Sequence, residues 1–155
     1  MTTPAPTMSQ QMAPRVNHRL FVLLDTRAPE NPQESSLPQG DEILRASRYG
    51  VVFLSGGDQF RPAVTVEVWP QPPAVATDGT QWDEVVDAQF EAPSGTIRLR
   101  SIMGGKAGPD ITITAGPIRL RAHTRGRGQA MERLGMTIDY EGVEEWLLQL
   151  WPAPA

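Results

Sequence analysis

Hydrophobic and polar residues alternate along much of the chain, in short stretches that end at glycine or proline. In Ala63–Trp69, all three valines fall on one face of an extended segment. Trp82–Glu91 and Pro117–Thr124 repeat the pattern. A period of two sends successive side chains to opposite faces, which is typical of a strand with one buried and one exposed side. These segments are therefore predicted to be strands of half-buried sheets.

Two other segments are apolar on both faces. Val16–Thr26 contains five consecutive apolar residues, and Glu145–Trp151 is interrupted only by Gln149. The short run Tyr49–Leu54 is also apolar and stops at a pair of glycines. Because a strand that is apolar on both sides needs cover on both sides, Val16–Thr26 is expected to be buried from both sides and Glu145–Trp151 to take a central position.

The turn signals divide the chain into about eight short strands. Ala92-Pro93-Ser94-Gly95 is the strongest of them, since proline presets one turn dihedral and glycine accepts a positive φ. It predicts a hairpin between Trp82–Glu91 and Thr96–Met103. With 14 glycines and 15 prolines, long helices are disfavoured. The pattern predicts an all-β fold: an antiparallel β-sandwich with one or two short helical turns.

The remaining segments carry weaker patterns. Residues 1–14 lack periodicity and are interpreted as a disordered N-terminal arm, so that residues 15–155 form a single β-sandwich domain. Arg27–Gln39 is predicted to be a loop, and Asp41–Ser47 to be two turns of helix. Whether Gln129–Met136 is helix or loop is left open by its sequence.

Length and composition exclude several classes of protein. A chain of 155 residues with 39% hydrophobic residues closes one core, and it contains no cysteine for disulfides, thiol nucleophiles or thiolate metal sites. No apolar run reaches the roughly 20 residues of a membrane span. The first residues have neither the basic head nor the apolar core of a signal peptide, so a cytoplasmic location without membrane association is expected.

The motifs that could carry chemistry fail on spacing. Met103-Gly104-Gly105-Lys106 lacks the remaining glycine and the Ser or Thr of a phosphate-binding loop, and Ser55 lacks the glycine that a nucleophile elbow needs on its N-terminal side. His18 and His123 are too few for a metal site without cysteines. We therefore predict no enzymatic activity, no catalytic residues, no cofactor and no metal.

The net charge of -4 is the sum of separate acidic and basic segments of the chain. Residues 78–91 hold five acids and no base, whereas residues 96–127 hold seven bases and one acid. By strand alternation, the arginines of two strands project away from the core. If these strands were neighbours, up to five guanidinium groups would share one outer surface and bind an acidic partner protein. The candidate partner-binding residues are Arg98, Arg100, Arg119, Arg121 and Arg125.

A structural alternative explains the same arginines. The acidic strand Trp82–Glu91 could lie beside Thr96–Met103 in the predicted hairpin and neutralise it through cross-strand ion pairs. Both interpretations stay open at this point. Nucleic acid is disfavoured as a partner, because the basic stretch contains none of the aromatic residues on which single-stranded bases stack.

Three segments carry a resemblance to a known family. The runs DAQFEAPSGTIRLRSIMGG, PDITITAGPIRLRAHT and EEWLLQLWPAP resemble the competence protein J family, small inhibitors of a DNA-entry nuclease, and related small actinobacterial proteins. HRLFVLLDT and RYGVVFLSGG lie where that family also has strands. The N-terminal arm, Gln129–Met136 and the terminal WPAP depart from the pattern, and no nuclease-contacting residue carries over.

The resemblance implies a β-sandwich and a nuclease-inhibitor or immunity-type protein that masks a partner, such as a nuclease or toxin. Two other functions remain open. A structural or assembly protein would use the arm and the terminal strand for subunit contacts, so an oligomer is compatible with the sequence. A carbohydrate-binding sandwich would use Trp69 or Trp82 for stacking, whereas Trp146 and Trp151 are expected in the core.

Overall fold

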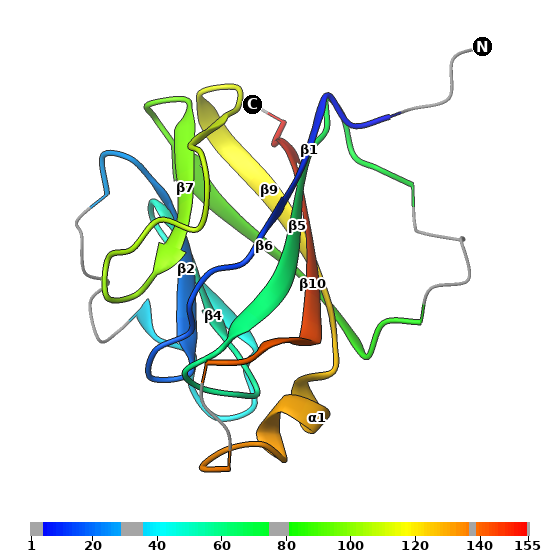
Figure 1. The fold of residues 1–155 in the computed structure, drawn as a ribbon. Helices are drawn as coiled ribbons and strands as arrows, with labels where there is room; N and C mark the ends of the chain where they lie inside the picture. The colour runs from blue at the N-terminus through cyan, green and yellow to red at the C-terminus, as the bar shows by residue number, and fades with distance from the viewer. Residues whose placement is uncertain (1–4, 29–35, 75–80, 137–138, 155) are drawn as a thin grey trace.

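The structure is a computed structural model and describes residues 5–28, 36–74, 81–136 and 139–154. Ten strands form two five-stranded sheets packed face to face, and a short helix, α1 (Arg127–Met131), protrudes at one end of the sandwich (Figure 1). The prediction of an all-β fold of mostly antiparallel sheets is confirmed. Among the described residues, no helix has the length and apolar character needed to cross a bilayer.

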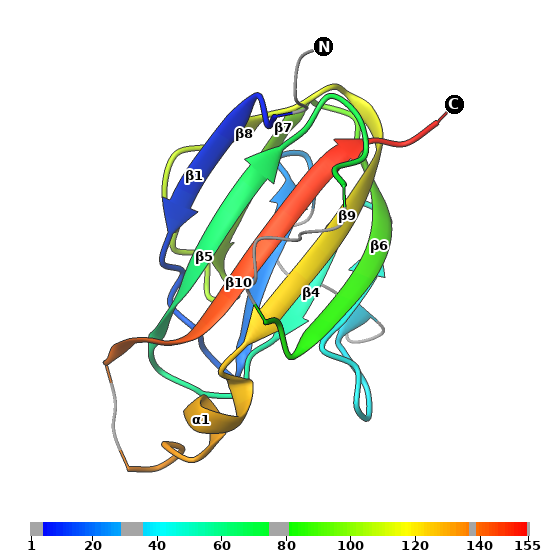
Figure 2. The same cartoon turned by 90° about the vertical axis from the view of Figure 1, so that its right-hand side faces the viewer.

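The five strands of the first sheet lie side by side in Figure 2. This sheet is called the β10 sheet after its central strand. Its order is β1 (Met8–Met12), β5 (Arg61–Val68), β10 (Glu141–Pro152), β9 (Gly116–Arg125) and β6 (Glu84–Ala92). β5 and β10 pair in parallel, and the other neighbours are antiparallel. The central place predicted for Glu145–Trp151 is confirmed.

The second sheet, called the β2 sheet, is antiparallel throughout. Its order is β3 (Leu44–Ser47), β4 (Gly50–Leu54), β2 (Leu20–Asp25), β7 (Thr96–Ser101) and β8 (Ile111–Thr112). All six residues of β2 are buried. The reason is a second apolar cluster on the outer face of this sheet, where Val22 packs with Leu20, Leu24 and Val52. The two-sided apolar pattern of this strand therefore reflects burial on both sides.

Aromatic residues join the inner faces of the two sheets. Trp146 of β10 meets Phe21 of β2 and Phe53 of β4 edge to face, with ring centroids 5.4 Å apart in both pairs. Phe21 and Phe53 stack on each other at 4.9 Å. Edge-to-face and offset-stacked rings each add to the free energy of burial. This cluster fixes the separation and orientation of the sheets.

The prediction of a disordered arm over residues 1–14 is wrong for Met8–Met12. These residues form β1, with Met8 opposite Val68 and Met12 opposite Val64 of β5. Met12 is buried in the main core. The pattern is hard to recognise because Gln10 interrupts the apolar side of the strand. Residues 1–4 lie outside the described residues.

Two predictions of local structure also need correction. Asp41–Ser47 does not form a helix, because Leu44–Ser47 pairs with β4 as strand β3, and this pairing overrides the local preference. The open question of Gln129–Met136 is resolved: α1 ends at Met131, and the turns that follow are closed by hydrogen bonds such as Met136 N–H to the Arg133 carbonyl (3.1 Å).

The predicted hairpin around Ser94 is wrong in its pairing. β6 lies in the β10 sheet and β7 in the β2 sheet, so the turn carries the chain across the sandwich. Buried Asp25 holds this turn, since its carboxylate accepts hydrogen bonds from the Ser94 backbone N–H (3.1 Å) and hydroxyl (2.8 Å). The sequence correctly places a reversal here but contains no signal for the change of sheet.

Candidate partner-binding surface

The five candidate arginines lie on opposite sides of the sandwich. Arg98 and Arg100 belong to β7, whereas Arg119, Arg121 and Arg125 belong to β9. Each strand turns its arginines away from the core, as alternation predicts, but the two strands are in different sheets. The predicted surface of five guanidinium groups is therefore wrong in its geometry. Partner binding by either group of arginines remains a prediction.

On the β2 sheet, both arginines have local partners. Arg98 donates to the two carboxylate oxygens of Asp110 at 2.8 and 2.9 Å, and Lys106 approaches the same carboxylate at 3.5 Å. Arg100 is only 7% exposed and donates to the Ser101 carbonyl at 2.9 Å. Both candidate arginines of β7 are therefore held in contacts within the chain.

The Arg98–Asp110 pair predicts a change of stability in acid. The hydrogen bond from Arg98, reinforced by the charges of Arg98 and Lys106, lowers the pKa of Asp110 to about 2. A carboxyl group whose pKa is depressed by folding stabilises the protein above its unfolded pKa, and this contribution is lost as the pH falls toward the folded value. We expect Asp110→Asn to reduce the decline of unfolding free energy between roughly pH 4 and pH 2. Urea unfolding at each pH measures the free energy of unfolding. The same decline with falling pH in both proteins would contradict the assignment.

Two arginines of β9 each contact one acidic and one aromatic side chain. Arg121 pairs with Asp87 of β6 at 3.0 Å and lies 5.4 Å from the centroid of the Trp151 ring. Arg125 pairs with Glu145 of β10 at 2.9 Å and lies over Trp82 at 5.1 Å. The acidic strand β6 therefore lies beside β9 rather than β7 and pairs with Arg121, while Glu145 of β10 pairs with Arg125, which corrects the structural alternative drawn from the sequence.

Arg119 differs from the other candidates. Its side chain is exposed, its cross-strand neighbours are the uncharged Gln89 and Trp151, and no ion pair or hydrogen bond of its guanidinium occurs within the described residues. Arg121 and Arg125 lie on the same face of the same strand. The outer face of the β10 sheet around Arg119 is therefore the candidate partner-binding surface.

Tryptophan side chains contact two of these arginines: Trp151 of β10 lies at Arg121, and Trp82, just before β6, lies at Arg125. Trp82 packs on His123 with ring centroids 5.5 Å apart, and Trp69 donates its indole N–H to Glu67 at 3.0 Å. Both rings are half-buried, while Trp146 and Trp151 are buried as predicted. The contacts of Trp82 and Trp151 with these arginines could not be predicted from the sequence, because the pairing of β6 and β10 with β9, rather than chain proximity, brings them together.

His123 adds no charge to this surface. It is buried, and its Nδ1 lies 3.4 Å from the Leu147 carbonyl oxygen. Burial lowers the pKa of His123, so the imidazole is neutral at pH 7. Within the part of the chain that the structure describes, no group of three or more His, Cys, Asp or Glu side chains is placed to hold a metal ion.

A buried carboxylate that no sequence pattern singles out lies at the α1 end of the sandwich. Glu144 is completely buried, and its oxygens accept hydrogen bonds from the Ser55 hydroxyl (2.8 Å), the Gly56 N–H (2.7 Å) and the Trp146 indole (2.8 Å). Burial raises the pKa of Glu144, and the three donors and the nearby Arg127 oppose that rise. The group ties β4 and β10 together inside the fold.

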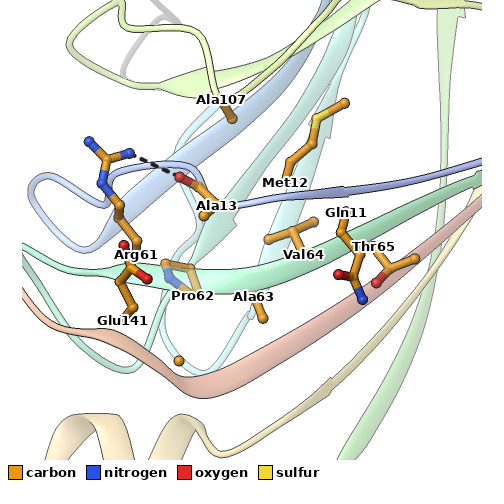
Figure 3. A pocket seen from close by; sticks show the side chains of 11 residues that line it. Gln11, Met12, Ala13, Arg61, Pro62, Ala63, Val64, Thr65, Ala107 and Glu141 are labelled. Carbon is orange, nitrogen blue, oxygen red and sulfur yellow. Dashed lines mark hydrogen bonds between the residues drawn. The ribbon is translucent and has the colours of Figure 1, made fainter.

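The pairing of β10 with β5 is irregular beside Glu144. Three residues separate Glu141 from Glu145, whereas only Pro62 separates their partners Arg61 and Ala63 on β5. Gly142 and Val143 take up the excess with φ angles of 74° and 73°. The bulge breaks the pairing with β5, and a shallow hollow of about 340 Å³ opens there between Arg61, Pro62 and Glu141 (Figure 3).

The fold is a β-sandwich similar to that of ComJ. One similar solved structure is that of ComJ, inhibitor of the DNA degrading activity of NucA, from Bacillus subtilis; the TM-score is 0.60 at 12% identity, over 98% of this chain and 100% of that one. A second is described as crocagin biosynthetic gene J, with a TM-score of 0.59 at 13% identity, over 94% of this chain and 96% of that one.

No family model and no curated protein matches the chain. At these identities the structural likeness establishes the fold alone. It confirms the resemblance to the competence protein J family as one of architecture.

Proposed function

We propose that this chain is a non-catalytic binding protein that inhibits a partner, most specifically a DNA-cleaving nuclease, by masking it. The observation that carries the proposal is the match of fold over almost the whole of this chain and the whole of ComJ, which is an inhibitor of a DNA-degrading activity. Inhibition by masking needs a rigid complementary surface and no catalytic group on the inhibitor.

The docking surface in this proposal is the outer face of the β10 sheet around Arg119. Ion pairs and aromatic rings hold Arg121 and Arg125 in fixed positions, so they lose little conformational freedom when a partner binds. Arg119, which lacks a carboxylate partner among the described residues, is available for one from the partner. An acidic surface on the nuclease fits this arrangement.

The proposal predicts a large effect of charge reversal at Arg119. Once crosslinking in the native cell has identified the nuclease, the purified chain is titrated into a DNA-cleavage assay. We expect Arg119→Glu to weaken inhibition about tenfold, and less at high salt, because it replaces an attraction with a repulsion. The matched control is Arg27→Glu, the same reversal at an exposed residue that follows β2 of the other sheet.

The two variants should unfold at the same temperature as the wild type. Equal inhibition by Arg119→Glu and Arg27→Glu would contradict the docking surface. A wild-type chain that neither binds nor inhibits the nuclease would contradict the proposed function itself.

A further inference from the structure

The two long edges of the sandwich are closed to different degrees. At the β6 edge, the β3–β4 turn reaches across to the other sheet: the Glu91 N–H donates to the Arg48 carbonyl at 2.8 Å, and the two side chains form an ion pair at 3.5 Å. The opposite edge lies between β1 and β8, and β8 is only two residues long. The sheets are therefore less well joined at the β1 edge.

Hollows flank β1 on both sides. One of about 340 Å³ lies where β1 meets β5 and the β10 bulge, and in Figure 3 Gln11 and Thr65 point away from Met12 and Val64 there. Another, of about 360 Å³, lies between β1 and residues 109–112 of the other sheet. Met12 lines both hollows. Apolar side chains at this edge are therefore close to solvent.

β1 lacks the features that usually protect an edge strand from pairing with another chain. Such strands are commonly blocked by charged residues, proline or a bulge. Met8–Met12 contains none of these, and its five partner positions on β5 follow in unbroken register. Ser9, Gln10 and Gln11 are exposed, and within the described residues no strand pairs with the outer edge of β1.

We propose that this edge binds a second copy of the same chain through antiparallel pairing of β1 with β1. The strand Met-Ser-Gln-Gln-Met is nearly palindromic, so a two-fold axis at Gln10 places Met8 opposite Met12 of the second copy. Ser9 then lies opposite Gln11 of the second copy, and no like charges meet. Met8, which is half-buried in one chain, gains an apolar neighbour across the axis, and the second copy covers part of the hollow beside residues 109–112.

This interface uses the edge of the β10 sheet and leaves its outer face free, so it does not depend on the proposed function. A five-residue strand pair buries less than the roughly 1,200 Å² of a stable specific interface, even with part of each hollow covered. The dimer should therefore dissociate in the micromolar range, on the order of 1–100 μM.

Two double variants test the strand register by sedimentation equilibrium. In Ser9→Lys/Gln11→Glu, each new lysine faces a glutamate across the axis, whereas in Ser9→Lys/Gln11→Lys it faces another lysine. Within one chain, both variants place the lysine that replaces Ser9 opposite Glu67 and the residue that replaces Gln11 opposite Thr65, so the fold is perturbed alike. We expect the dimer of the lysine–lysine variant to dissociate about ten times more readily than that of the lysine–glutamate variant.

Circular dichroism melting curves confirm that both variants are folded. A wild-type chain that stays monomeric up to about 0.5 mM, above the whole expected range of dissociation constants, would overturn the proposal. Equal dissociation constants for the two folded variants would also overturn it, because the contact would then lie away from β1. These outcomes are independent of any nuclease assay.

Discussion

Replacing Glu144 with alanine is expected to destabilise the protein by about 3–5 kcal/mol, because three buried donors lose their acceptor at once. The Ser55 hydroxyl, the Gly56 N–H and the Trp146 indole all donate to this carboxylate, and Glu144 itself is inaccessible to solvent. An unsatisfied buried donor costs about 1–3 kcal/mol. For a chain of this length, the melting temperature should fall by roughly 10 °C or more.

The neighbouring residue provides the control for this experiment. Glu145 is adjacent in sequence but half-exposed, and it pairs with Arg125 on the outer face of the sheet. Glu145→Ala should cost less than about 1 kcal/mol, since partly exposed ion pairs contribute little. Thermal and urea unfolding of the two variants measure the difference. Similar losses of stability in both would show that Glu144 does not organise this end of the sandwich.

Gly126→Ala is expected to be the second severe substitution, with a loss of about 3 kcal/mol or more. Gly126 has a φ angle of +85°, and a Cβ atom added there would lie 2.0 Å from the Val143 carbonyl oxygen. Val143 belongs to the β10 bulge next to Glu144, and its own φ angle is 73°. The backbone would have to move in the region where β9, α1 and β10 meet.

Gly128, two residues further along, is the matched control. It lies in α1 with open space around the position of a Cβ atom. Gly128→Ala should therefore leave stability unchanged or raise it by up to about 1 kcal/mol, because alanine favours a helix. Urea unfolding of both variants is the measurement. A mild effect of Gly126→Ala would contradict the close approach to Val143.

Strand alternation accounts for most of what the sequence predicts correctly about the fold. It gives the inner faces of β5 and β9 and the buried positions of β2 and β10, because burial on one side or both leaves a regular mark on the sequence. β1 and β3 are missed because each is short and has few apolar residues. Their strand conformation depends on pairing with β5 and β4, which no local pattern encodes.

The candidate site was predictable only in part, because its geometry also depends on which strands pair. Alternation correctly turns the arginines of β7 and β9 outward, but it does not tell which sheet each strand joins. The turn at Ser94 is clear from its residues, whereas its anchor, Asp25, lies 69 positions earlier in the chain. Likewise, Glu144 shares the inner face of β10 with Trp146, but its donors Ser55 and Gly56 lie 89 and 88 positions earlier in the chain, and no local pattern shows that contact.

The surface proposed to bind the partner lies on a rigid part of the fold. The Trp146 cluster joins the sheets, and the ion pairs of β9 hold Arg121 and Arg125 in position beside Arg119. A preorganised surface binds with a smaller entropic cost than a mobile one. Stability at the Glu144 end and inhibition at the Arg119 surface should therefore respond to different substitutions.

The most direct test of the proposed function is a titration of the purified chain into a DNA-cleavage assay of the nuclease from its own cell, at a nuclease concentration well above the dissociation constant. Masking predicts a linear loss of cleavage that ends at one folded inhibitor chain per nuclease. It also predicts that the Arg27→Glu variant inhibits cleavage as the wild type does and that the Arg119→Glu variant inhibits it less. Full cleavage at every ratio, with the chain folded and the nuclease identified by crosslinking, would contradict the account.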